Sequence, residues 1–179
     1  MAAGVYRSLF HTSAERRMVM GYFAQPTDSG AMPGRVAPLT PARLQATLDS
    51  QHWHYEVDED GDLRGSWDGH MFYFMRVGPH QEILMIRGRW EARPSIETGE
   101  SMLPLLNKWH REHLFPKAHV VDFPDDGNSR VFTELVIDCE HGVTDEQLLL
   151  HISAGITTSI DLFKDLNKAY PGLQETDDD

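Results

Sequence analysis

The sequence predicts an α+β domain in which an antiparallel sheet carries its helices on one face, in the order helix, three strands, helix, two strands, helix. Two observations lead to this prediction. Three segments are typical of helices, the first and last of them with clear helix-start signals, and the stretches between them alternate apolar and polar residues around turn dipeptides. The length of 179 residues, with 40% hydrophobic and 25% charged residues, is typical of one globular domain.

The first helix and the first strands are predicted from residues 39 to 90. In "LTPARLQATLDS", Thr40 is a suitable N-cap and Pro41 suits the first helical position. The following stretch, "WHYEVDEDGDLRGSWDGHMFYFMRVGPHQEILMIRGRW", predicts three antiparallel strands in a meander. Its turn dipeptides are Asp60-Gly61, Asp68-Gly69 and Gly78-Pro79.

The second half of the chain predicts a helix, a hairpin and a long helix. The second helix covers about residues 99 to 114, with Pro104 in its first turn, and stops before Phe115-Pro116. The strands "AHVVDF" and "RVFTELVIDC" flank the turn "PDDGNS" and predict a hairpin. A capping box of Thr144 and Gln147 then opens the last helix, which Pro171-Gly172 ends.

The two ends of the chain differ in composition from the middle. Residues 1–37 show no helical or strand periodicity and predict a disordered leader. Alternatively, translation starts at Met18 or Met20, and residues 1–17 are then not part of the protein. Residues 173–179 predict a solvated acidic tail. The folded domain is therefore expected to span residues 38–172.

Charge and cysteine content limit the classes of partner and compartment. The formal net charge of −12 repels phosphate backbones, which disfavours nucleic acid as a partner. No apolar run approaches the roughly 20 residues of a membrane-spanning helix, so no membrane insertion is expected. The single cysteine, Cys139, cannot form an intramolecular disulfide and suits a reducing compartment, so a cytoplasmic location is expected.

Four stretches carry a resemblance to a known family: "DEDGDLRGSWDG", "ILMIRGRW", "LNKWHREHLFPKAHV" and "GVTDEQLLLHISAGI". Over about residues 39–171 the chain resembles the YbjN family of sensory transduction regulators, whose fold is similar to that of type III secretion chaperones. The most specific part is Asn107, Trp109 and Phe115-Pro116-Lys117. The family usually has Asn directly after this Trp, where this chain has His110. The resemblance implies a non-enzymatic, protein-binding regulator or chaperone-like domain without a catalytic set or cofactor.

The pair His110 and His113 raises the alternative of a small metal-dependent enzyme. At about 100° per residue both side chains fall on the apolar face of the predicted helix, which favours buried or half-buried rings hydrogen-bonded to the backbone. A zinc site needs three or four ligands and this spacing supplies two. The further ligand would come from His119, Glu134, Cys139 or His141.

Other motifs point to structural roles. The acidic turn "DEDGD" resembles a calcium loop, but the register puts Trp67 where a bidentate Glu is required, so a hairpin turn is predicted. Cys139 continues an alternating strand and is predicted to be a small core residue. No phosphate-binding loop or nucleophile elbow occurs.

Three arginines form the best candidate surface for a protein partner. Arg87 and Arg89 point to one face of the third strand, and Arg76 lies on the neighbouring strand. They are expected either to bind an acidic partner segment or to pair across strands with Glu82, Glu91 or Glu134. A homodimer and a small-ligand sensor with a pocket between sheet and helices are further expectations.

Overall fold

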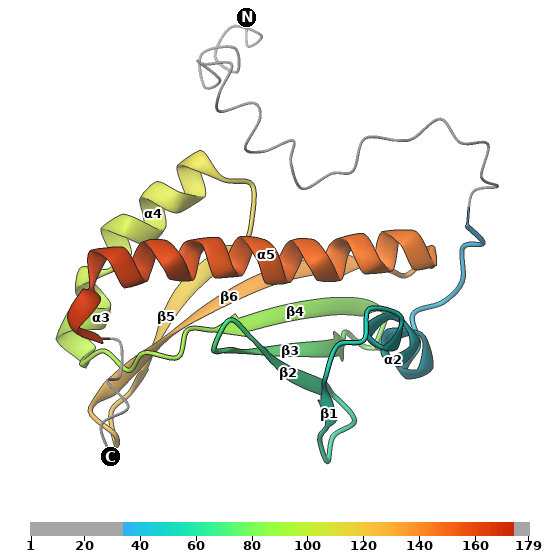
Figure 1. The fold of residues 1–179 in the computed structure, drawn as a ribbon, viewed down its shortest axis with the longest axis horizontal. Coiled ribbons are helices and arrows are strands. Elements are labelled where there is room, and N and C mark those ends of the chain that lie inside the picture. The colour runs from blue at the N-terminus through green and yellow to red at the C-terminus, as the bar shows by residue number, and fades with distance from the viewer. Residues whose placement is uncertain (1–33, 174–179) are drawn as a thin grey trace, which may run out of the picture. The chain divides into compact units, whose positions relative to one another are not determined.

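The fold is that of a computed structural model, which describes residues 34–173. A six-stranded antiparallel sheet has the strand order β1-β2-β3-β4-β6-β5 (Figure 1). The elements follow the chain in this order: α2 (Pro41–Ser50), β1 (Glu56–Val57), β2 (Leu63–Trp67), β3 (His70–Val77), β4 (Ile83–Arg89), α3 (Ile96–Ser101), α4 (Leu103–Glu112), β5 (Lys117–Phe123), β6 (Asn128–Asp138), α5 (Asp145–Ala169) and the 3-10 helix η2 (Pro171–Leu173).

The α+β class and the antiparallel sheet agree with the sequence prediction, but the sheet has one more strand than the five predicted. Where three strands were predicted, β1 to β4 form, because three turns separate four extended segments. The additional pairing is short: only Glu56 and Val57 of β1 pair with β2. Trp53 and Tyr55, which precede them, pack against the hydrophobic core instead.

The second predicted helix is two helices that meet at Met102. It begins earlier than predicted, because Ser95 is an N-cap whose side chain accepts a hydrogen bond from the Thr98 amide. Pro104 lies in the first turn of α4, as expected. A proline there cannot donate to the carbonyl of Glu100, four residues earlier, so one continuous helix through this point is disfavoured. Met102 itself is fully buried.

The described helices pack on one side of the sheet, and α5 covers most of it (Figure 1). Thr133 of β6 donates a hydrogen bond to Ser159 of α5, with 2.7 Å between their side-chain oxygens. Gly155 lies so close to Ile86 of β4 that an added Cβ would be 2.7 Å from the Ile86 Cγ2 atom. The sheet and α5 therefore meet at small residues, and the core lies between them.

The N-terminal border of the fold is tied to the start of α5. Ala37 and Val143 exchange two backbone hydrogen bonds, at 3.2 and 3.0 Å. Arg43 donates to the carbonyl oxygens of both residues and also pairs with Asp145. Ordered contacts thus already include Ala37, next to the predicted border at residue 38. Residues 1–33, with the alternative start sites, and residues 174–179 of the acidic tail lie outside the described residues.

Candidate functional site

The two histidines of the H-x-x-H pair each make a structural contact. The Nε2 atom of His110 accepts a hydrogen bond from the Ala118 backbone N–H at 2.9 Å. The ring of His113 stacks on Trp109, with centroids 3.7 Å apart and planes 9° apart. Contact with the backbone agrees with the prediction, and so does the half-buried ring of His113, the C-cap of α4, whereas His110 is exposed. His110 lies on the last turn of α4, which ends at Glu112, and its ring reaches the edge strand β5 and not the core.

The other family-motif residues surround the same turn of chain. Trp109 is buried, whereas Asn107 is exposed on α4. Phe115 is half-buried and Pro116 is buried, and the peptide bond between them is cis. These residues connect α4 to the edge strand β5.

The proposed further metal ligands do not complete a site around this pair. His119 lies on β5 with its Nε2 atom 4.0 Å from Glu134, and Cys139 is buried after the end of β6. Burial, followed by the charge of Asp138, raises the pKa of the Cys139 thiol, in keeping with a core residue. Between residues 34 and 173, no three His, Cys, Asp or Glu side chains form a group able to hold a metal ion.

The acidic turn has its predicted structural role. The Asp58 carboxylate accepts hydrogen bonds from the backbone amides of Asp60 and Asp62, at 3.0 and 2.9 Å. Gly61 has a positive φ of 84°, which closes the turn between β1 and β2.

The sheet side opposite the helices, called the open face here, is defined by the alternate positions of the strands. In the register, Met75, Met85 and Val136 form one row across β3, β4 and β6, and Tyr73, Arg87, Glu134 and Lys117 form the next. The described helices pack on the other side (Figure 1). The open-face positions include Arg64, Met71, Tyr73, Met75, Met85, Arg87, Arg89, Lys117, His119, Arg130, Phe132, Glu134 and Val136.

The first row is apolar and accessible. Met75 and Met85 are half-buried, and Val136 is 51% exposed. Methionine adapts its shape to different partners, and an accessible methionine row is a common feature of protein-binding surfaces. The sequence prediction missed this row, although the alternation in "HMFYFMRV" carries a signal: both sets of alternate positions are rich in apolar residues.

The second row is a charge network around Glu134. This carboxylate is only 7% exposed and accepts hydrogen bonds from Arg87 at 2.6 Å and Lys117 at 2.9 Å. Burial by itself would raise the pKa of Glu134, but the hydrogen bonds from Lys117 and Arg87 outweigh it and hold the pKa below its ordinary value. Burial lowers the pKa of the neighbouring His119, against the opposing effect of Glu134.

The three predicted partner-binding arginines do not share a face. Arg87 pairs across strands with Glu134, as expected, whereas Arg89 pairs with Glu91, two residues further along the chain, at 3.0 Å. Arg76 lies on the neighbouring strand, as expected, but it is opposite the buried Leu84. Its side chain therefore belongs to the helix-bearing side, because alternate residues of a strand face opposite sides.

A concave feature lies between α2 and α5. This open groove of about 580 Å³ has Ala42, Ala46 and Leu149 among its lining residues, with Arg43, Asp145 and Glu146. It differs in place from the predicted ligand pocket between sheet and helices.

These features define an α+β domain whose helices cover one side of an antiparallel sheet. A family model described as "YbjN: Putative bacterial sensory transduction regulator" matches residues 40–168. The chain belongs to the YbjN family, which confirms the resemblance seen in the sequence. The structure is similar to the "Crystal structure of YbjN, a putative transcription regulator from E. coli", with a TM-score of 0.62 and 17% identity over 75% of this chain and 96% of that chain. At this identity the likeness shows the fold. No curated protein matched the sequence.

No helix within residues 34–173 has both the length and the apolar character needed to cross a membrane.

Proposed function

We propose that this protein is a non-enzymatic regulator or chaperone-like domain that binds another protein through the open face of its sheet. The observation that carries this proposal is the row Met75, Met85 and Val136, which lies on the side of the sheet opposite the helices. The family description as a regulator supports a role in signalling. Regulators of this kind act through contacts, and an accessible apolar patch with a polar border is the usual form of a protein contact site.

The border of this patch favours a partner with acidic groups. Arg87 and Arg89 lie on the same face as the apolar row, at 35% and 29% side-chain exposure. Each is held by one carboxylate, yet an arginine has five N–H donors, so each retains donors for a second acceptor. A partner segment with apolar residues over Met75 and Met85 and acidic residues over the arginines fits this arrangement.

The first experiment compares two matched exposed apolar residues. Val136→Asp places a charge in the patch, and Leu103→Asp places the same charge on α4, where Leu103 is 47% exposed against 51% for Val136. Full-length wild-type and variant proteins are purified from the native cell after crosslinking, and their partners are quantified by mass spectrometry. We expect Val136→Asp to reduce recovery of the specific partner by at least about tenfold, as an unpaired charge at the centre of an interface does. Leu103→Asp should retain it.

The second experiment tests the border with the Arg87→Glu, Arg89→Glu double variant. Its thermal unfolding is measured first, because Arg87 also binds the buried Glu134. A double variant that keeps both its fold and all its partners would remove the arginines from the proposed surface. Equal loss of the partner in Val136→Asp and Leu103→Asp would contradict the use of the open face altogether.

A further inference from the structure

One end of the open face gathers arginines from two segments. Arg89 is the last residue of β4 and pairs in register with Phe132 of β6. Arg130 lies two residues from Phe132 on the same side of β6. The side chains of Arg89 and Arg130 are therefore diagonal neighbours on adjacent strands, a distance that long side chains readily span.

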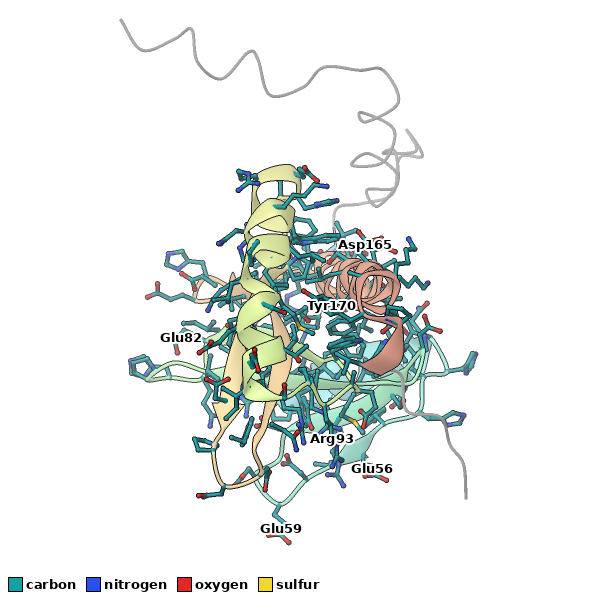
Figure 2. The ribbon with its side chains drawn as sticks, turned by 90° about the vertical axis from the view of Figure 1, so that its left-hand side faces the viewer. Glu56, Glu59, Glu82, Arg93, Asp165 and Tyr170 are labelled. Atoms are coloured by element: carbon teal, nitrogen blue, oxygen red, sulfur yellow. The ribbon has the colours of Figure 1, made fainter. Side chains whose placement is uncertain are left out.

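Arg93 joins them because the chain after β4 continues beside β6. The Trp90 N–H donates to the Val131 carbonyl at 3.0 Å, and the Ser129 N–H donates to the Pro94 carbonyl at 2.8 Å. These two bonds hold residues 90–94 alongside residues 129–131, which places Arg93 next to Arg130. Figure 2 shows Arg93 on the side of the molecule away from Asp165 of α5, as an open-face position requires.

The charges of this cluster are only partly compensated. Arg89 pairs with Glu91, whereas no salt bridge within residues 34–173 involves Arg93 or Arg130. Burial lowers the pKa of Arg130, and the positive charges of Arg93 and Arg89 lower it further, against Asp126 and Glu91. Like charges held close together destabilise a fold. An overall charge of −12 makes this local concentration of arginine more unusual.

We propose that Arg89, Arg93 and Arg130 form a binding site for the phosphate group of a small organic molecule. The planar guanidinium group matches the oxygen geometry of phosphate, and a phosphate monoester carries close to two negative charges at neutral pH. Arg93 and Arg130 form no salt bridge with any residue between 34 and 173, and two such arginines suit that charge better than the single charge of a carboxylate.

The surroundings indicate the remainder of the ligand. Arg89 is flanked by Met71 and Phe132 across the strands, and the guanidinium of Arg130 lies 5.8 Å from the Phe123 ring centroid. A carbon skeleton or ring attached to the phosphate would contact these side chains. Arg89 also belongs to the border of the proposed partner surface, whereas Arg93 and Arg130 do not, so variants of these two arginines test the phosphate site separately from the protein partner.

The test is a titration of the full-length protein with inorganic phosphate, phenyl phosphate and pyrophosphate, with acetate and benzoate as carboxylate controls. Ionic strength is kept constant at a physiological value, because salt screens exposed charges. Arginine side-chain N–H signals in NMR spectra report the site and the dissociation constant. We expect saturable shifts with the phosphates, tighter binding of phenyl phosphate than of inorganic phosphate, and no saturation with acetate.

Matched variants locate the site. Arg93→Gln and Arg130→Gln should each weaken phenyl phosphate binding by about tenfold, the loss of a charge-assisted hydrogen bond. Arg64→Gln, on the same face but paired with Glu56, should change it less than about twofold, as surface pairs contribute little. Equal effects of all three variants, or equal binding of benzoate and phenyl phosphate, would overturn the site. A phosphoserine peptide that binds more tightly than phenyl phosphate would overturn the small-molecule assignment and point to a phosphorylated protein.

Discussion

The Nε2 atom of His110 accepts the backbone N–H of Ala118 at 2.9 Å, and this bond connects α4 to the outer edge of the sheet. The N–H of Ala118 points away from β6, because the β5–β6 ladder uses the alternate residues on either side of it. Since β5 is an edge strand, its outward N–H groups have no strand partner. His110 satisfies one of them.

We predict that His110→Ala lowers the free energy of unfolding by about 1 kcal/mol, the usual contribution of one such hydrogen bond. The amide of Ala118 should also exchange with solvent faster. Urea unfolding measures the first effect and NMR-detected hydrogen exchange the second. His110→Gln is the matched control, because its side-chain oxygen is also an acceptor. A slow Ala118 amide in His110→Ala would show that the bond contributes nothing.

The contact between α5 and the sheet predicts an effect of Gly155→Ala. Alanine favours a helix by about 1 kcal/mol over glycine, but the added Cβ would be 2.7 Å from Ile86 Cγ2, inside a buried contact. Overpacking of this kind costs about 1–3 kcal/mol, so we expect a net loss of about 1 kcal/mol in urea unfolding. Gly172→Ala has no atom within 4 Å of the new Cβ and should be nearly neutral. A more stable Gly155→Ala variant would mean that the helix and sheet separate easily.

The buried histidine His70 predicts that stability falls in mild acid. Burial holds the pKa of His70 below its ordinary value, and its Nδ1 atom accepts the Glu91 N–H at 3.3 Å. As the pH falls below the unfolded-state pKa of about 6.5, the unfolded chain takes up the proton first, so the folded state loses stability. Burial also lowers the pKa of His119 and of His151.

We therefore expect a lower urea midpoint at pH 5.5 than at pH 7.5, and a smaller decrease in His70→Gln than in wild type. His80→Gln changes an exposed residue of the turn between β3 and β4 and should follow the wild type. Equal pH dependence of all three proteins would exclude His70 as a cause of the loss of stability at pH 5.5.

Glu134 predicts a second loss of stability at lower pH. Its pKa is below the ordinary value, so its stabilising effect is complete above about pH 4.5 and is lost as the pH falls through the folded-state pKa. Glu134→Gln leaves the nearby cations of Arg87 and Lys117 without their carboxylate and should cost about 2 kcal/mol at pH 7.

The difference between wild type and Glu134→Gln should shrink as both are unfolded by urea at successively lower pH down to about 3. Glu91→Gln removes the acid that pairs with Arg89. Glu91 is more exposed than Glu134, so this variant should cost less than about 0.5 kcal/mol. If the difference in unfolding free energy between wild type and Glu134→Gln stays constant with pH, the effect of the substitution comes from packing and not from the charge of Glu134.

The predicted elements agree best where the signal is local. Thr40 and Thr144 are N-caps in the structure, and the capping box of Thr144 with Gln147 is complete. Such signals depend on a few neighbouring residues, so they survive folding unchanged. The break at Met102 and the short strand β1 were missed, although the proline in the first turn of α4 and the third turn before β4 are local signals for them.

The candidate site was harder to predict, because the pairing register of the strands decides which residues lie together on one face of the sheet. Arg87, Arg89 and Arg76 were grouped by type and strand, and only the pairing of Arg76 with Leu84 shows that it lies on the other side. The row of Met75, Met85 and Val136 likewise exists only once three strands from distant parts of the chain are aligned.

The sequence by itself determined the fold class, the family and the starts of the first and last helices, because capping, alternation and turn chemistry act over a few residues. Tertiary structure decided which residues share a face, that His110 binds an edge amide and that Arg93 lies beside Arg130. These relationships arise from strand register and from the packing of α4 and α5 on the sheet. No local pattern encodes them, since the residues concerned meet only after the chain has folded.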